Sequence, residues 1–230
     1  SVERVTTVGK EIIYDIEVTG NRPDAMSIVG IAREAVAILP RFGINAKLTG
    51  DPYTTKLSLP VIKKPTLKLT VKTDSKLNPC WTSVVFDHVT IAPSPKWLTH
   101  YLELSGIRSI NNCIDITNFL MRAYGQPAHV YDYDSIKGHV MTLRASKKGE
   151  KLMTLDREKH ALPGDDIVIA DASGELIDLC GIMGGKNSSV TGKTTRVVLF
   201  LQTYDPAHIP KTSMSLAHRT EAASLFEKGL

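Results

Sequence analysis

The chain has 230 residues, enough to bury a core in one large domain or in a domain with an appendage. Hydrophobic residues make up 42% and charged residues 23%, which is typical of an ordinary soluble globular protein. The formal charge of +4 and the pI of about 8.9 permit contact with nucleic acid, but they do not indicate a dedicated duplex binder.

The three cysteines, Cys80, Cys113 and Cys180, lie far apart and form no CxxC pair. We therefore expect neither a disulfide framework nor a structural zinc site, and we interpret them as buried thiols in a reducing compartment. No long apolar run and no signal peptide are present, which predicts a soluble, cytoplasmic protein without a membrane partner. The start at Ser1 without methionine indicates a piece of a longer polypeptide.

The N-terminal part begins with strands and continues into a helix. Residues 1–19 alternate apolar and polar side chains, and residues 20–24 break this pattern. We expect Arg22 and Asp24 to brace this turn and Ser27 to cap the next helix. One face of that helix is apolar and Pro40 ends it; its apolar residues are Ile28, Ile31, Ala32, Ala35, Val36 and Leu39.

A change in composition marks the next part of the chain. Residues 48–65 are rich in Gly, Pro, Thr and Lys, which predicts a linker and a domain boundary. Residues 67–72 predict an alternating strand whose lysines, Lys68 and Lys72, either contact phosphates or form a solvated edge. Residues 84–91 predict a second strand, and the helix that starts at Pro93–Pro95 ends at Gly106.

The stretch from Asn111 to Tyr133 contains the most distinctive pattern. Polar residues cap an apolar helix that ends at Gly125, and residues 126–129 follow as a stiff turn. This arrangement places Thr117 and Asn118 on a helix and holds His129 in a fixed segment.

The second half consists mainly of short strands. They are expected at 140–145, 151–155, 166–170, 176–180 and 196–201, with turns of Gly, Asp, Pro and Lys between them. The predicted class is α+β, with helices packed beside a multi-stranded antiparallel or mixed sheet and a small β-α segment in front.

Two features suggest chemistry. The loop at Cys180–Gly185 has little side-chain cover, so its N–H groups can approach a ribose, a phosphate or an oxyanion, although such a loop is most often only a turn. His129 with Asp132 and Asp134 resembles a His-carboxylate group, but no second histidine stands at ligand spacing, which disfavours a metal.

The motifs NNCIDITN at 111–118 and GQPAHVYDYD at 125–134 resemble the B3/B4 region of the bacterial phenylalanyl-tRNA synthetase β subunit. Further matches include NRPDAMSIVGIAREAVAIL, SPKWLTHYLELSGIRSINN, LCGIMGG and RTEAASLFEKG, in the same order as in the family. In that family the region hydrolyses tyrosine wrongly attached to tRNA(Phe). The resemblance implies the tail of a small domain with a linker at 1–62 and a B3/B4 editing-like domain at 63–230.

The resemblance also implies which residues form the editing pocket. Catalytic roles fall on His129, Gly181 and Gly184, and substrate contacts fall on Thr117, Asn118, Pro127, Cys180 and Phe200. At Phe200 the family carries a glutamate that accepts a hydrogen bond from the tyrosine hydroxyl, so tyrosine selection is expected to be weakened or lost. Gln202 points to the same face of the strand and could offer another acceptor.

In this interpretation water is the nucleophile and backbone N–H groups of the glycine loop stabilise the oxyanion. The region itself needs no cofactor or metal, whereas the whole synthetase is expected to use ATP and Mg²⁺. The implied partners are tRNA(Phe) and the α subunit of an α2β2 heterotetramer. Two alternatives remain open, namely an editing-inactive structural or tRNA-binding module of the same synthetase, and a protein that binds a free sugar or nucleotide at the Gly181 loop.

Overall fold

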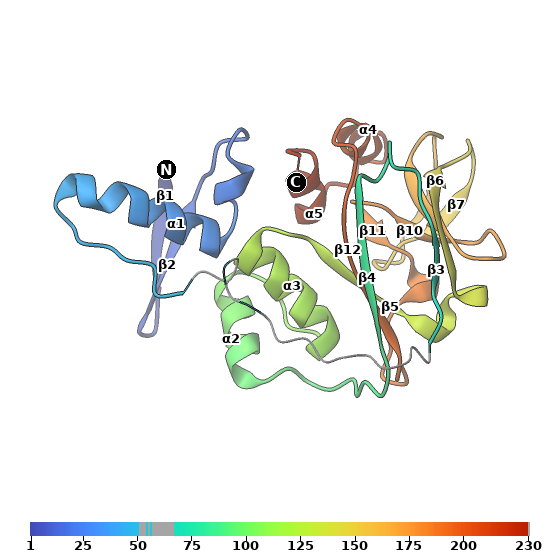
Figure 1. The fold of residues 1–230 in the computed structure, drawn as a ribbon, viewed down its shortest axis with the longest axis horizontal. Coiled ribbons are helices and arrows are strands. Elements are labelled where there is room, and N and C mark those ends of the chain that lie inside the picture. Colours follow the sequence, from blue (N-terminus) through green and yellow to red (C-terminus); the bar gives the residue numbers. More distant parts are fainter. Residues whose placement is uncertain (51–53, 55, 57–66, 230) are drawn as a thin grey trace.

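A β-hairpin and a helix form the N-terminal part of the computed structural model, which describes residues 1–50, 54, 56 and 67–229 (Figure 1). Strands β1 (Val2–Val8) and β2 (Glu11–Ile16) pair antiparallel, and α1 (Ile28–Ile38) follows. The Ser27 side chain accepts a hydrogen bond from the Gly30 N–H at 2.9 Å, which confirms the predicted cap.

The predicted brace of the turn is also present. The Arg22 guanidinium donates to both carboxylate oxygens of Asp24, at 2.9 and 2.8 Å, and it reaches Glu34 on α1 at 2.7 Å. The turn is thus fixed to the helix that follows it. The predicted linker at 48–65 falls mostly outside the described residues, so the domain boundary stays a prediction.

Two sheets carry the larger part of the fold. The five-stranded sheet has the order β11-β10-β9-β6-β3, and the pair β3 and β6 is parallel while the others are antiparallel. Its strands are β3 (Thr70–Lys72), β6 (Val140–Ala145), β9 (Ile167–Ala170), β10 (Leu176–Leu179) and β11 (Met183–Gly184). The three-stranded sheet is antiparallel with the order β4-β12-β5, formed by β4 (Cys80–Phe86), β5 (Ala128–Asp132) and β12 (Val197–Thr203). A separate hairpin pairs β7 (Lys151–Met153) with β8 (Lys159–Ala161).

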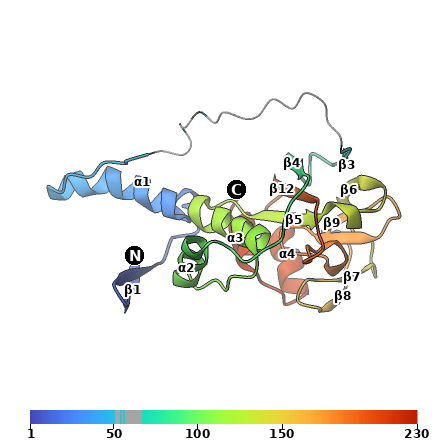
Figure 2. The same cartoon turned by 90° about the horizontal axis from the view of Figure 1, so that it is seen from below.

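Four helices complete the described part of the chain after residue 67. Helices α2 (Lys96–Leu104) and α3 (Asn112–Tyr124) pack against each other and lie between the N-terminal part and the sheets, as both views show (Figures 1 and 2). Helices α4 (His208–Ser215) and α5 (Glu221–Phe226) follow β12. The α+β class with a mixed sheet is therefore confirmed.

The main core is formed by side chains from both sheets and from the C-terminal helices. Its largest fully buried residues include Tyr131, Phe200, Phe226, Ile169, Ile177 and Leu179. Burial of this apolar surface, at about 25 cal/mol per Å², is the main stabilising term. The small N-terminal hairpin contrasts with it, because every residue of β1 is exposed.

Some predicted boundaries were wrong. Strand β4 starts at Cys80 rather than 84 and ends at Phe86, since His88 adopts a positive φ of 55° that a continuing strand does not allow. The stiff turn at 126–129 is shorter than expected: Ala128 and His129 already belong to β5 because they pair with Leu201 and Phe200 on β12. Strands β8 and β11 were not predicted.

The buried carboxylate of Asp115 ties α3 to the segments around it. It accepts hydrogen bonds from Ser94 Oγ and Ser109 Oγ, each at 2.5 Å, and from the Ile110 N–H at 2.8 Å. Asp115 is fully buried, so this charge depends on these three donors. The contacts fix both ends of α2 relative to α3.

We predict that Asp115→Ala lowers the free energy of unfolding by about 3 kcal/mol, because three donors lose their acceptor inside the protein. Urea unfolding followed by circular dichroism measures this change. The neighbouring Ile116 is 47% exposed. Ile116→Ala is therefore a control expected to change stability by no more than about 0.5 kcal/mol. Equal losses in the two variants would contradict the anchoring role of Asp115.

Candidate functional site

His129 and Phe200 face each other across two strands. They are direct partners in the antiparallel pair of β5 and β12, so both side chains project from the same face of the three-stranded sheet. Tyr131, two residues after His129, lies on that face as well, with its ring centroid 4.5 Å from the imidazole. This face points into the core between the sheets.

The glycine loop meets this face at Gly184. A Cβ atom at Gly184 would lie 2.4 Å from His129 Nε2, so only glycine allows the imidazole to approach the backbone this closely. His129 Nε2 is buried and has no hydrogen-bond partner among the residues that the structure describes. The structure thus brings together the predicted histidine and one glycine of the predicted loop.

Gly181 has a different surrounding. Its φ is 72°, and a Cβ atom there would lie 2.6 Å from the Cδ1 atom of Ile209 on α4. The preceding Cys180 is buried in the core. Gly181 therefore serves close packing of the loop against α4, and binding of a free sugar or nucleotide there stays a prediction.

A buried acid that the sequence analysis missed lies beside this site. Asp178 on β10 is paired with Gly184 on β11, and its carboxylate accepts a hydrogen bond from the Tyr131 hydroxyl. Burial raises the pKa of Asp178. Burial lowers the pKa of His129, and the nearby Asp178 opposes that shift in part. The only signal in the sequence was an acidic residue inside the otherwise apolar run 176–180.

Phe200 is fully buried and fills the space over the sheet. Its ring centroid lies 4.4 Å from that of Trp81 and 5.8 Å from that of Tyr131. Gln202, on the same face, is 6% exposed, and its Oε1 atom is buried without a hydrogen-bond partner among the described residues. Apolar rings thus surround the position of Phe200, and the unpartnered polar atoms on the same face are His129 Nε2 and Gln202 Oε1, among the described residues.

The remaining predicted residues lie around this face. Thr117 is buried and its hydroxyl donates to the Ile114 carbonyl at 2.7 Å, while Asn118 is half-buried on the same helix. Helix α3 packs against β5, and Pro127 lies in the connection between them. These positions bring the helix and His129 into one region; their contact with a substrate stays a prediction.

The two acids after His129 have structural partners. Asp132 accepts a hydrogen bond from Thr194 Oγ1 at 2.5 Å, and Asp134 accepts one from Arg196 Nε at 3.0 Å. Neither interaction involves His129. The three cysteines are free. The expectation that all are buried is correct for Cys180 and wrong for Cys80, which is exposed on β4, and for Cys113, which is half-buried on α3.

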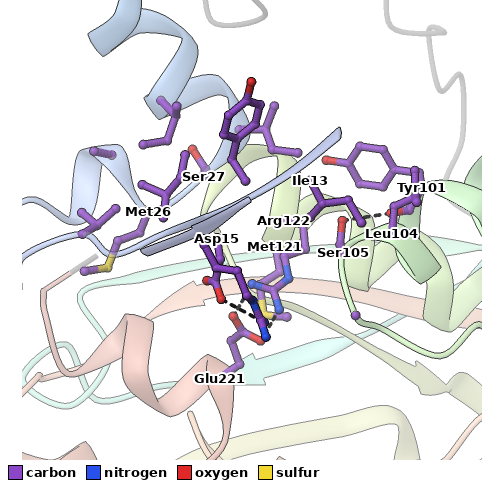
Figure 3. Close-up of a pocket in the computed structure, with 18 of the residues that line it drawn as sticks. Ile13, Asp15, Met26, Ser27, Tyr101, Leu104, Ser105, Met121, Arg122 and Glu221 are labelled. Atoms are coloured by element: carbon purple, nitrogen blue, oxygen red, sulfur yellow. Dashed lines mark hydrogen bonds and ion pairs between the residues drawn. The ribbon is translucent and has the colours of Figure 1, made fainter. Parts of the chain in front are cut away.

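A separate cavity of about 940 Å³ lies where the N-terminal part meets α2, α3 and α5 (Figure 3). Its lining residues come from the N-terminal part, among them Ile13 and Met26, and from the later helices, among them Tyr101 on α2. Arg122 on α3 forms an ion pair with Glu221 on α5 at its edge. None of the predicted editing residues lines this cavity.

The sequence profile of the B3/4 domain matches residues 78–230. The chain is 36% identical over 221 residues to the phenylalanine–tRNA ligase beta subunit of Oceanobacillus iheyensis, covering 96% of this chain and 26% of that protein. It is 38% identical over 218 residues to the same subunit of Streptococcus pneumoniae strain R6, covering 95% and 26%. The chain thus spans about a quarter of the length of the curated relatives it matches.

A solved structure is also similar. It is an N-terminal fragment of the phenylalanyl-tRNA synthetase β subunit from Pyrococcus horikoshii, with a TM-score of 0.47 and 16% identity, covering 94% of this chain and 64% of that one. Among the described residues, no helix is both long and apolar enough to cross a membrane.

We predict that His129 stays neutral below the ordinary histidine pKa of about 6.5, because burial disfavours its charged form. A lowered pKa in the folded state means that the unfolded chain binds more protons below pH 6.5. The stability contribution of His129 is therefore complete above that pH and declines as the pH falls toward the folded pKa.

Urea unfolding at pH 7.5 and pH 5.5 measures this effect, with His129→Asn as a variant that does not titrate. The parent is expected to lose more stability on acidification than the variant. Asp178 contributes with the opposite sign, because burial raises its pKa, and His129 opposes that rise in part. The difference between the proteins therefore reports on His129 together with its coupling to Asp178. An equal loss in parent and variant would show that His129 does not titrate differently on folding.

Proposed function

Because the chain belongs to the B3/4 domain family, we propose that it is the B3/4 module of a phenylalanyl-tRNA synthetase β subunit in which tyrosine editing is weak or absent. In this proposal the complete protein is cytoplasmic and acts with an α subunit to join phenylalanine to tRNA(Phe), using ATP and Mg²⁺. This module receives the aminoacylated 3′ end of the tRNA.

The observation that carries the proposal is the environment of Phe200. The family glutamate at this strand position accepts a hydrogen bond from tyrosine, whereas Phe200 has no acceptor and its ring is packed against Trp81 and Tyr131. A tyrosine hydroxyl buried here without a partner would cost about 1 to 3 kcal/mol. A site that hydrogen-bonds a hydroxyl can discriminate by about 10⁴ or more, whereas apolar contact alone discriminates by about 10 to 200.

The glycine loop offers few free donors for an oxyanion. The N–H groups of Cys180, Ile182 and Gly185 already donate to the backbone carbonyls of Ile167, Leu179 and Ile177, at 2.9, 3.0 and 2.8 Å. An oxyanion hole needs donors that point at the developing charge rather than at other parts of the protein. This pattern of hydrogen bonds supports slow hydrolysis of the aminoacyl ester, in addition to weak selection of tyrosine.

His129 remains in a position to act on substrate if one reaches it. Its Nε2 atom has no hydrogen-bond partner in the described part of the chain and lies against Gly184, and its lowered pKa keeps the imidazole neutral at physiological pH. A neutral imidazole can orient a water molecule or a ribose hydroxyl. His129 would thus position the ester and the attacking water, and Thr117 and Asn118 on α3 would hold the substrate.

A second candidate is an editing hydrolase whose hydroxyl acceptor has moved to Gln202. The buried Gln202 Oε1 has no partner among the described residues, and an unpaired acceptor of this kind favours a donor such as a tyrosine hydroxyl. Gln202 lies two residues from Phe200 on the same face of β12. This arrangement predicts tyrosine-selective hydrolysis that depends on Gln202.

We predict that the synthetase assembled with this β subunit deacylates Tyr-tRNA(Phe) at nearly the uncatalysed rate, and that Phe200→Glu raises this rate about tenfold or more. The reason is that the carboxylate restores the missing acceptor. Radiolabelled Tyr-tRNA(Phe) measures the rate directly. Phe200→Leu is the matched control, because it removes the ring without adding an acceptor, and thermal unfolding shows whether each variant folds.

Gln202→Met separates the two candidates, since methionine keeps the size of glutamine and removes the amide. Fast hydrolysis by the parent that falls about tenfold in Gln202→Met would replace the first candidate with the second. Fast hydrolysis that is unchanged in Gln202→Met would contradict both candidates. Slow hydrolysis in the parent and in a folded Phe200→Glu variant would show that the site lacks more than its acceptor.

A further inference from the structure

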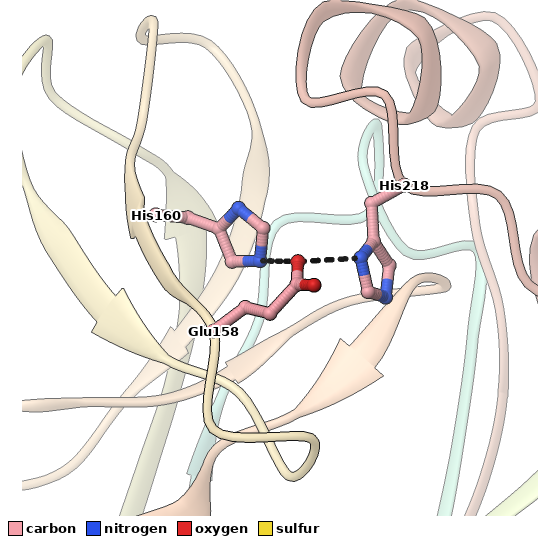
Figure 4. A group of neighbouring side chains, drawn as sticks. All are labelled: Glu158, His160 and His218. Atoms are coloured by element: carbon pink, nitrogen blue, oxygen red, sulfur yellow. Dashed lines mark ion pairs between the residues drawn. The ribbon is translucent and has the colours of Figure 1, made fainter.

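A group of ionisable side chains lies on segments that contact the glycine loop but contribute none of the residues of the His129 face. Glu158 and His160 belong to the β7–β8 hairpin, and His218 lies between α4 and α5 (Figure 4). One possible ligand atom from each residue lies within 4.8 Å of the other two. The two histidines are far apart in the sequence, so spacing alone does not reveal the group.

The imidazole of His160 is the most informative member. The residue is 8% exposed, and its buried Nε2 atom has no hydrogen-bond partner among the described residues. The same atom points toward Glu158 and lies 3.8 Å from its Oε2 atom, which is beyond hydrogen-bond distance (Figure 4). A buried nitrogen without a partner is costly, and a bound cation would satisfy its lone pair.

His218 is held so that its Nδ1 atom faces the Glu158 carboxylate, which His160 also faces. Its Nδ1 atom lies 3.5 Å from Glu158 Oε2, and its backbone is fixed by two hydrogen bonds to Ser213, at 2.9 and 3.0 Å. The Nε2 atom faces Asp156 Oδ2 at 3.6 Å. Asp156 is itself fixed, since it accepts hydrogen bonds from Thr154 Oγ1 at 2.6 Å and from the Glu158 N–H at 3.2 Å.

A carboxylate behind a histidine is the usual outer partner of a metal ligand, because it sets the tautomer and directs the opposite nitrogen to the ion. Here Asp156 would favour a proton on Nε2 of His218 and leave Nδ1 free to bind. The arrangement thus contains three ligand atoms. It also holds a carboxylate 3.6 Å from His218 Nε2, just beyond hydrogen-bond distance, which would orient this ring once the group closes around the ion.

We propose that Glu158, His160 and His218 bind one Zn²⁺ ion. Two imidazole nitrogens and one carboxylate oxygen are ligands that zinc prefers, whereas Ca²⁺ and Mg²⁺ need mainly oxygen ligands. Ligand atoms around a tetrahedral zinc ion lie about 3.3 Å apart, whereas the three present ligand atoms lie within 4.8 Å of one another. The Glu158 side chain is 62% exposed and can follow the ion, and rotation of the two imidazole rings would close the remaining distance between them, with water in the fourth position.

The ion would connect two segments that both contact the glycine loop. In the hairpin, the Leu155 N–H donates to the Gly184 carbonyl at 3.1 Å, and near His218 the Thr220 hydroxyl donates to the Ile182 carbonyl at 3.0 Å. Zinc would therefore fix the hairpin to the start of α5 and stabilise the loop between them. This role is structural and does not depend on the editing activity.

The test uses the untagged full chain, dialysed against a chelator and then titrated with Zn²⁺. We expect one zinc per chain by calorimetry and by elemental analysis. We also expect a rise in Tm of about 5 to 10 °C at a free zinc concentration about 100-fold above Kd. Ca²⁺ at the same concentration should leave Tm unchanged.

Substitutions assign the site. His160→Gln and His218→Gln should each weaken zinc binding at least about 100-fold, and Asp156→Asn about 10-fold to 100-fold. His100→Gln is the matched control, because His100 is 60% exposed on α2 and lies outside the group. Zinc should bind this control as tightly as the parent.

Each outcome decides the proposal. Absence of zinc uptake by the folded parent at 100-fold molar excess would overturn it and leave Glu158 as an ion-pair partner of the two histidines. Uptake that persists in both folded histidine variants would overturn it as well, since the ion would then be bound elsewhere. Loss of stoichiometric zinc binding in both folded histidine variants, with binding retained by His100→Gln, would support it.

Discussion

The contact of Phe200 with Trp81 and Tyr131 is the constraint on which the account of this site depends. These three rings occupy the face of the β4-β12-β5 sheet that points into the core, directly beside His129. Tyr131 extends the contact to the second sheet, since its hydroxyl donates to Asp178 on β10. One aromatic cluster thus joins the two sheets and defines what the site can accept. Because Phe200 is fully buried among these rings, it stabilises the core and offers a substrate no hydrogen-bonding group.

The same packing explains why the glycines of the loop have different roles. Gly184 allows the imidazole of His129 to lie against the backbone, and Gly181 allows Ile209 of α4 to approach. Both positions need a residue without a side chain, for packing reasons that hold with or without a substrate. The loop is therefore part of the structural core, and any catalytic role in this chain adds to that function.

Much of the fold followed from local patterns. The helix caps at Ser27 and Asn111 and the end of α3 at Gly125 were predictable because they depend on nearby backbone geometry. The strand boundaries at β4 and β5 were less predictable, since pairing with β12 decides them and β12 is distant in the sequence. Strand β11 has two residues, too few for a periodic pattern.

The candidate site was predictable only in part, because it too depends on contacts between residues that are distant in the sequence. The family resemblance pointed to His129, Gly184 and Phe200, and the structure places these three together. It did not point to Asp178 or to the group at Glu158, His160 and His218, whose members come together only through the fold. Packing between segments that are distant in the sequence brings such residues together, and their spacing in the sequence does not indicate that they are neighbours.

The most direct test of the account is the ratio of deacylation rates for Tyr-tRNA(Phe) and Phe-tRNA(Phe) by the assembled synthetase. A site lined by Phe200 without a hydroxyl acceptor predicts a ratio no larger than about 10 to 200, close to what apolar contact alone provides. A ratio of about 10⁴ or more would contradict it, because discrimination of that size requires a buried group that hydrogen-bonds the tyrosine hydroxyl.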